Sequence, residues 1–313
     1  MLFAGCASFV SNTAGQSTLA GPAVELTQVP FFPQSRYQCG PAALATALAA
    51  SGVAVTPEPL VAQLYVPGRR GSFQVEMKAA ARRYGRIPYE LQTGVDGLRG
   101  ELAAGRPVLV LQNLAFDWAP RWHYAVVVGH EQDGRRVVLR SGRTERQVTR
   151  WSSFQRTWSL AERWGIVLLR PGELPAVGDP ATYLEAVVAA GDQLVRADVA
   201  AALAAGLTAW PANADLNFAA ANVARDQGDD REAMDLYQRT LALAPAHVGA
   251  LNNLADLLST LGCQTAAQTM AERGLKAAGD SALGSVLGAT LAEITVRRAA
   301  DRADAPWCAA LTD

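Results

Sequence analysis

The chain has 313 residues, enough for two domains that each bury a hydrophobic core. Hydrophobic residues make up 50% of the chain, charged residues make up 18%, and the formal net charge is −1, which is typical of a globular protein. This balance lacks the excess of positive charge with which proteins bind nucleic acid, so we expect no nucleic-acid partner. The 4 cysteines show no metal-ligand spacing, and we expect no metal and no cofactor.

The N-terminal stretch MLFAGCASF resembles the end of a bacterial lipoprotein signal, in which small residues precede a cysteine that becomes lipidated. Two small residues precede Cys6 here, although Phe3 stands where such signals favour leucine and no charged segment comes first. Residues 8–21 are rich in Gly, Ser and Thr, which is typical of a flexible tether. The resemblance implies that residues 1–26 anchor the protein through lipidated Cys6 to a membrane of the bacterial cell envelope, facing the periplasm. The alternative is an apolar tail without a role.

Residues 27–172 mix predicted helices with predicted strands. Residues 42–50 are nearly free of helix breakers and predict a helix, and the patterns of residues 57–65, 74–84 and 98–104 predict three more. Apolar, β-branched runs predict strands over residues 106–114, 123–129, 135–142 and 164–170. Asp133-Gly134 lies between the second and third of these runs and is typical of the turn of a β-hairpin. A helical half followed by a largely antiparallel sheet indicates an α+β domain.

Cys39 stands directly before Gly40-Pro41 at the start of the first predicted helix. Proline is tolerated in the first turn of a helix, so Cys39 is expected at or just before the helix N-terminus. The free backbone N–H groups and the positive end of the helix dipole stabilise a thiolate at that position and lower the thiol pKa. Cys39 is therefore a candidate nucleophile. The alternative is a small buried side chain packed among alanines.

A thiol nucleophile needs a base, and the chain has 3 histidines. His247 lies at a helix start in the C-terminal half, where a surface or capping role is expected. His130 ends a strand near the hairpin turn, where we expect it to be exposed. His123 begins that strand, close to the sheet edge that the N-terminus of the Cys39 helix can meet, and it is our candidate base. The alternative for His123 is a structural histidine with satisfied hydrogen bonds.

Gln34 lies five residues before Cys39, from where its amide N–H can reach an oxyanion together with the backbone N–H of Cys39. The order of Gln34, Cys39-Gly40-Pro41 and His123 resembles the papain-like cysteine peptidases of the bacteriocin-leader-processing type, the double-glycine peptidase-like family. The resemblance covers roughly residues 27–170. It implies peptide-bond cleavage through an acyl-enzyme, with Cys39 as nucleophile, His123 as base and then acid, and Gln34 in the oxyanion hole.

One position departs from this family in its chemistry. The family places Asp or Asn after the histidine strand to orient the imidazole, whereas this sequence has Ser141 at the matching place. A hydroxyl can accept a hydrogen bond from the imidazole N–H but cannot offset the imidazolium charge. We therefore expect lower activity, unless Asn113 or Asp117 takes over the orienting role. Gln34 is also one residue nearer to the cysteine than in the best-known leader peptidases.

Proline and glycine in residues 173–180 indicate a linker, and the Ala-rich residues 181–300 after it are predicted to be helical. Pro211-Ala212 recurs as Pro245-Ala246, Gly228 as Gly262, and Ala233 as Ala267, each 34 residues later. This period resembles tetratricopeptide repeats, in which small residues are needed where neighbouring helices touch. The alternative is a set of unrelated Ala-rich helices. Residues 301–313 are expected to form a C-terminal tail, and Cys263 and Cys308 could pair in an oxidising envelope.

These patterns predict an α+β papain-like cysteine peptidase domain at residues 27–172, followed by an all-α tetratricopeptide-repeat solenoid. We expect a cell-envelope cysteine peptidase that cleaves a peptide or protein substrate, with repeats that recruit the substrate or a protein partner. Two alternatives are an acyl transferase that uses the same Cys/His pair and a non-catalytic peptide-binding adaptor. Ser141 favours the adaptor, whereas the presence of Gln34, Cys39 and His123 together favours the enzyme.

Overall fold

The computed structural model of the chain describes residues 19, 21–66, 68, 71–300, 304 and 307–308. Cys6 and most of the predicted tether lie outside the described residues. Contacts divide the chain into two compact units: an N-terminal unit, Met1–Phe73 with Glu90–Val167, and a C-terminal unit, Gln74–Tyr89 with Leu168–Asp313. The domain boundaries expected at residues 172, 180 and 300 stay predictions.

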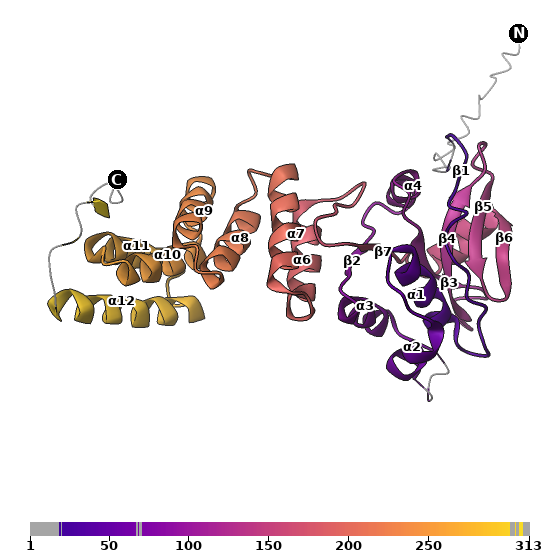
Figure 1. Cartoon of the computed structure of the whole chain (residues 1–313), viewed down its shortest axis with the longest axis horizontal. Coiled ribbons are helices and arrows are strands. Elements are labelled where there is room, and N and C mark those ends of the chain that lie inside the picture. The colour runs from indigo at the N-terminus through magenta and orange to yellow at the C-terminus, as the bar shows by residue number, and fades with distance from the viewer. Residues whose placement is uncertain are drawn as a thin grey trace, which may run out of the picture. The chain divides into compact units, whose positions relative to one another are not determined.

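All strands of the described residues belong to one sheet in the order β2-β7-β3-β4-β5-β6, with β1 paired to β4 (Figure 1). They are β1 Val24–Glu25, β2 Ile87–Glu90, β3 Val108–Asn113, β4 Trp122–His130, β5 Arg136–Ser141, β6 Thr144–Arg150 and β7 Gly165–Leu169. The four predicted strands are confirmed as β3, β4, β5 and β7, and β3 pairs antiparallel with both β4 and β7. The sequence TERQVTR of β6 was not expected to form a strand, because it lacks the apolar run of a buried strand. Its polar side chains suit the edge of the sheet, where β6 is largely exposed to water.

Two helices cover the two faces of this sheet. Helix α1, Cys39–Ala50, contacts β3, β4 and β5, and it is buried from Gly40 to Leu48 because its many alanines allow close approach. Helix α5, Trp151–Ser159, contacts β3, β5 and β6, and its Thr157 accepts a hydrogen bond from Gln112 of β3. Gln112 pairs in register with His123, so both side chains point to the face that α5 covers. The next residue, Tyr124, points to the other face and lines a cavity with residues of α1. Helices α1 and α5 therefore lie on opposite faces of the sheet.

Three more helices match their predictions closely. Helix α2 spans Pro57–Leu64, and α4 spans Val95–Ala103, which begins three residues before the expected start. Helix α3, Gln74–Arg83, also matches its prediction but belongs to the C-terminal unit by its contacts. Helix α5 was not predicted, although the spacing of its buried aromatic side chains Trp151, Phe154 and Trp158 is helical.

Strand β1 pairs antiparallel with the end of β4, where Gly129 and His130 lie. Val24 pairs with His130 and Glu25 pairs with Gly129. His130 is only 4% exposed, so the expectation that it is exposed is wrong, because β1 covers the end of β4 where the sequence suggested an open edge. A Cβ atom at Gly129 would lie 2.2 Å from the carbonyl oxygen of Val24, so only glycine lets the two backbones approach this closely.

The substitution Gly129→Ala is expected to lower the free energy of unfolding by about 3 kcal/mol, because β1 must shift to relieve the backbone clash. Urea unfolding followed by circular dichroism measures the loss. Gly191→Ala is the matched control, since Gly191 has helical backbone angles and a Cβ atom at this position would meet nothing within 4 Å. Equal stability of the two variants would contradict the proposed role of Gly129.

The C-terminal unit continues as a run of helices joined by short turns. They are α6 Pro180–Ala190, α7 Arg196–Ala209, α8 Ala214–Asp226, α9 Asp230–Leu243, α10 Val248–Thr260, α11 Gln264–Ala278 and α12 Ala282–Ala300. The starts of α8 and α10 lie 34 residues apart, as do those of α9 and α11. His247 caps α10 by accepting the backbone N–H of Ala250, which confirms the capping role expected for it. The region is helical as predicted, and its assignment to tetratricopeptide repeats stays a prediction.

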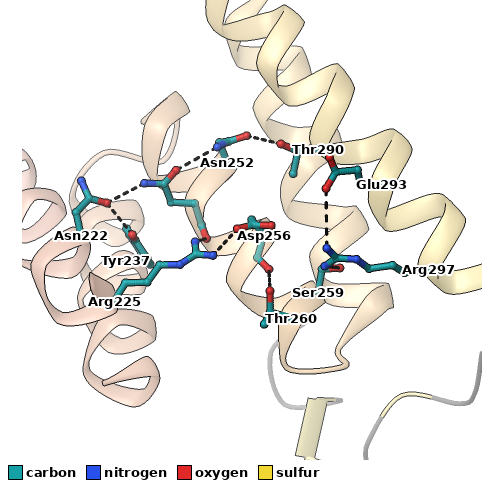
Figure 2. Close-up of polar contacts among 11 residues, drawn as sticks. Asn222, Arg225, Tyr237, Asn252, Asp256, Ser259, Thr260, Thr290, Glu293 and Arg297 are labelled. Carbon is teal, nitrogen blue, oxygen red and sulfur yellow. Dashed lines mark hydrogen bonds and ion pairs between the residues drawn. The ribbon is translucent and has the colours of Figure 1, made fainter. Parts of the chain in front are cut away.

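A chain of side-chain hydrogen bonds connects the helices of this unit (Figure 2). Tyr237 of α9 and Asn253 of α10 both donate to Oδ1 of Asn222 in α8, over 2.7 Å and 2.8 Å. Asn252 donates to Asn253, and Thr290 of α12 donates to Asn252 over 2.9 Å. The polar groups are therefore satisfied by one another, which fixes the register of neighbouring helices.

A disulfide joins Cys263, just before α11, to Cys308. The pairing that the sequence left open is therefore present. Asp304, in the same segment, accepts the backbone N–H groups of Gln264 and Thr265 at the start of α11. Cys263 itself gives α11 no side-chain cap, so Asp304 supplies the cap from a distant part of the chain. Within the described part of the chain, no helix has both the length and the hydrophobicity needed to span a membrane.

Candidate functional site

Cys39 is the first residue of α1, as the sequence predicted. The chain enters the helix through a tight turn in which the N–H of Gln38 donates to the carbonyl of Ser35. Tyr37 within this turn has a left-handed φ of 64°, a conformation that costs energy for a residue with a Cβ atom. Strain of this kind is frequent at functional sites, and Tyr37 lies two residues before Cys39.

The pKa of the Cys39 thiol is raised above its ordinary value by burial, and the backbone N–H groups of Tyr124, Gly40 and Cys39 act in the opposite direction. The sequence led us to expect a lowered pKa at a helix N-terminus. That expectation is wrong for this structure, because the loss of water around the thiol outweighs the helix end. Cys39 is thus a neutral thiol at pH 7 in the absence of a bound substrate.

Gln34, Cys39 and Ser141 line one small cavity together with Arg140 and Gly142. Its volume is about 10 Å³, room for roughly one water molecule. The backbone N–H of Gln34 donates to the carbonyl of Gly142 over 3.0 Å, which ties the segment before α1 to the end of β5. The structure therefore brings the predicted nucleophile, the predicted oxyanion residue and the orienter position to one place.

The side chain of Arg140 binds the backbone of the segment that precedes α1. Its side chain is 6% exposed and donates to the carbonyls of Val29, Thr27 and Glu145. A buried guanidinium with three carbonyl partners fixes the backbone that leads to Gln34. Arg140 was not singled out from the sequence, because its three carbonyl partners lie on distant segments and on the neighbouring strand.

The imidazole of His123 bonds to the orienter position. Its Nε2 lies 2.9 Å from Oγ of Ser141, the residue predicted to stand at the orienter position. Burial, with a smaller contribution from the nearby charge of Arg121, lowers the pKa of His123 to about 4. His123 is therefore neutral at pH 7, the form that can accept a proton.

His123 and Cys39 line two different cavities, and Ser141 and Gly142 line both of them. Successive residues of β4 point to opposite faces, so Tyr124 faces α1 while the His123 ring faces α5. No hydrogen bond joins the Cys39 sulfur to the His123 ring, and both residues belong to the described part of the chain. Catalytic hydrogen bonds are often long in the free enzyme and tighten when substrate binds.

The lowered pKa of His123 makes folding stability depend on pH. Between pH 6.5 and about pH 4 the unfolded chain binds a proton at His123 and the folded chain does not. The free energy of unfolding therefore decreases as the pH is lowered through that window. We expect His123→Gln to become more stable relative to the parent protein by about 2 kcal/mol when the pH is lowered from 7 to 4.5. Urea unfolding of both proteins at the two pH values measures this difference, and parallel losses of stability in both would contradict it.

Asn113 and Asp117, the alternative orienters, are placed away from this role. The Asn113 side chain is 1% exposed, accepts the backbone N–H groups of Ala115 and Arg121, and donates to the carbonyl of Phe116. It thereby closes the β3–β4 connection, in which Asp117 is exposed. The hydrogen bond that His123 makes goes to Ser141 and not to either of these residues.

A larger cavity of about 310 Å³ opens on the His123 side. It is bounded by β3, β4, the β5–β6 turn, β6 and α5, and it includes His123, Ser141, Arg143, Thr144 and Gln147. This cavity could not be expected from the sequence, because two of its walls, β6 and α5, were not predicted. Among the described residues, no cluster of three or more His, Cys, Asp or Glu side chains is arranged to hold a metal ion.

Part of the chain is similar in sequence to a known family. Residues 26–165 match the Peptidase C39 like family, and the match includes Gln34, Cys39, His123 and Ser141. The solved structures that resemble this chain include a Bacillus anthracis protein assigned as a C39-like peptidase. It is 18% identical, covers 47% of this chain and 98% of its own, and superposes with a TM-score of 0.40. No curated protein matches the sequence. The N-terminal unit thus combines C39-like sequence similarity with an antiparallel sheet and helices.

Proposed function

We propose that the protein is a cysteine peptidase whose nucleophile is Cys39. The observation that carries this proposal is the gathering of Gln34, Cys39 and Ser141 around one cavity, with His123 hydrogen-bonded to Ser141. The C39-like match over residues 26–165 supports the same reaction class. The substrate is a peptide or protein.

The chemistry starts from a neutral thiol and a neutral imidazole. Once substrate brings the two groups together, His123 takes the thiol proton as the Cys39 sulfur attacks the carbonyl carbon. The resulting oxyanion accepts hydrogen bonds from the backbone N–H of Cys39 and the Gln34 amide. His123 then gives its proton to the leaving amine, and water hydrolyses the acyl-enzyme with His123 again as base.

The test compares hydrolysis by the parent protein with that by Cys39→Ala, His123→Ala and Gln34→Ala. A mixture of unrelated peptides is incubated with each protein, and new termini are identified by mass spectrometry. We expect no cleavage by Cys39→Ala and a loss of roughly 10²- to 10⁴-fold for His123→Ala. Cleavage that persists in Cys39→Ala, or a parent protein that cleaves no peptide, would sink the peptidase proposal.

The remaining parts of the chain would supply location and recruitment. Lipidated Cys6 would anchor the protein in the bacterial cell envelope, facing the periplasm, and mass spectrometry of natively expressed protein would detect an acylated Cys6. The 34-residue offset of α8–α11 supports tetratricopeptide repeats that bind the substrate or a protein partner. Affinity capture with the helical unit, compared with the whole protein, identifies which part binds that partner.

A non-catalytic peptide-binding adaptor is the second candidate. The raised pKa of Cys39 and the serine hydroxyl that bonds His123 in place of a carboxylate favour it. The adaptor would bind peptides equally well before and after the substitution Cys39→Ala and would cleave none. An acyl transferase would need the same residues as the peptidase, and it is distinguished by product masses that include an added amine.

A further inference from the structure

The larger cavity beside His123 has a composition that points to a particular ligand. Its walls carry the hydroxyl and amide groups of Thr144, Gln147 and Ser153, and its one charged side chain is Arg143. None of the described residues that line it is an Asp or a Glu. Its volume of about 310 Å³ matches that of small-ligand sites in proteins.

We infer that this cavity binds the leaving-group half of the substrate and selects for a carboxylate on it. The inference rests on the proposed peptidase function. In acyl transfer the base that takes the thiol proton later protonates the leaving amine, so the leaving half must lie beside that base. His123 lines the larger cavity, Cys39 and Gln34 line the small cavity, and the two cavities share Ser141 and Gly142 as lining residues.

The carboxylate preference follows from the charges. A guanidinium pairs well with a carboxylate because its N–H groups match both oxygens. Arg143 follows Gly142, whose left-handed φ of 64° makes the tight turn between β5 and β6, and Arg143 is exposed and lines the cavity. The hydroxyl and amide groups around it suit the N–H and C=O groups of a peptide backbone. The carboxylate is either the C-terminus of a short leaving peptide or the side chain of an acidic residue.

Binding is measured on Cys39→Ala, so that it does not depend on turnover. The probes are three tripeptides with free amino groups: Ala-Gln-Ala amide, Ala-Gln-Ala with a free C-terminal carboxylate, and Ala-Glu-Ala amide. Affinity is followed by the shift of protein NMR signals during titration. We expect at least one carboxylate peptide to bind about tenfold more tightly than the uncharged amide, which is roughly the effect of one charge-assisted hydrogen bond.

The same titrations in Cys39→Ala proteins with Arg143→Gln or Arg150→Gln identify the cation. Arg150 is exposed, lies at the other end of β6 and does not line the cavity, so this control removes one positive charge elsewhere. We expect the preference to vanish with Arg143→Gln and to survive Arg150→Gln. Tighter binding of the free acid alone indicates a C-terminal carboxylate, and tighter binding of Ala-Glu-Ala amide alone indicates a side chain.

The inference is overturned if the three probes bind alike, if none binds, or if the preference survives Arg143→Gln. These outcomes are distinct from a failure of the peptidase proposal, which appears as no cleavage of any peptide by the parent protein. Carboxylate-selective binding without cleavage would leave the cavity as a peptide site of an adaptor. Cleavage without carboxylate selectivity would leave the peptidase intact and remove this inference.

Discussion

Removal of the Cys263–Cys308 disulfide is expected to lower the free energy of unfolding of the C-terminal unit by about 4 kcal/mol. The two cysteines are 45 residues apart in sequence, so the bond closes a long loop and restricts the unfolded chain considerably. Both side chains are buried, at 0% and 1% exposure, beside the hydrophobic core of α8–α12. Loss of the bond also frees Asp304, which caps α11 through Gln264 and Thr265.

The measurement is urea unfolding of the Cys263→Ser/Cys308→Ser double variant, followed by the helical circular dichroism signal. Dithiothreitol should destabilise the parent protein by a similar amount and should leave the double variant unchanged. Cys39→Ser provides the matched control, since Cys39 is a free thiol in the other unit. A loss below about 1 kcal/mol in the double variant would show that the C-terminal segment is held by its other contacts.

The elements with simple apolar patterns were predictable from the sequence. Strands β3, β4, β5 and β7 each contain continuous runs of β-branched and aliphatic residues, because nearly all of their side chains are buried whichever face they point to. The ends of helices α2 and α3 were predicted to within one residue. Helix α1 begins three residues before its predicted start, because its first turn includes Cys39-Gly40-Pro41. Such local signals need no knowledge of distant partners.

The elements that depend on distant partners were missed. Strand β6 is polar and gains its backbone hydrogen bonds from β5, so its own residues carry little strand signal. Strand β1 has two residues and exists because Gly129 lets it approach β4. With β1 unseen, His130 looked exposed, although the pairing buries it.

Candidate residues of the site could be selected from the sequence, but their pKa values could not be predicted from it. The order of Gln34, Cys39 and His123 in the sequence selected two residues that line one cavity with Ser141 and a histidine that bonds to Ser141, and their catalytic roles stay predictions. The pKa values of Cys39 and His123 follow from burial, which depends on every element packed around them. The position of Cys39 at a helix N-terminus predicts a lowered thiol pKa, whereas the removal of water around the thiol raises it.

Substitution of Ser141 by Asp is expected to raise the pKa of His123 by one to three units from its present value of about 4. Ser141 Oγ already lies 2.9 Å from Nε2 of His123, so a carboxylate at this position faces the imidazole directly. Ser141 also lines both cavities, which gives the longer side chain room. The negative charge stabilises the imidazolium that forms when Cys39 loses its proton, and we expect peptide cleavage to rise about tenfold or more.

Ser141→Asn separates charge from geometry, because asparagine has the shape of aspartate and can accept the same hydrogen bond without offsetting the imidazolium charge. The pKa of His123 is measured from its imidazole NMR signal, assigned by its disappearance in His123→Gln, and cleavage is measured on the same peptide mixture. We expect the rise in both quantities for Asp only. Equal activity of the Asp and Asn variants would mean that the orientation of the ring limits the reaction. An unchanged His123 pKa in the Asp variant would mean that the carboxylate does not reach the ring, and the assignment of Ser141 as the orienter position would then be wrong.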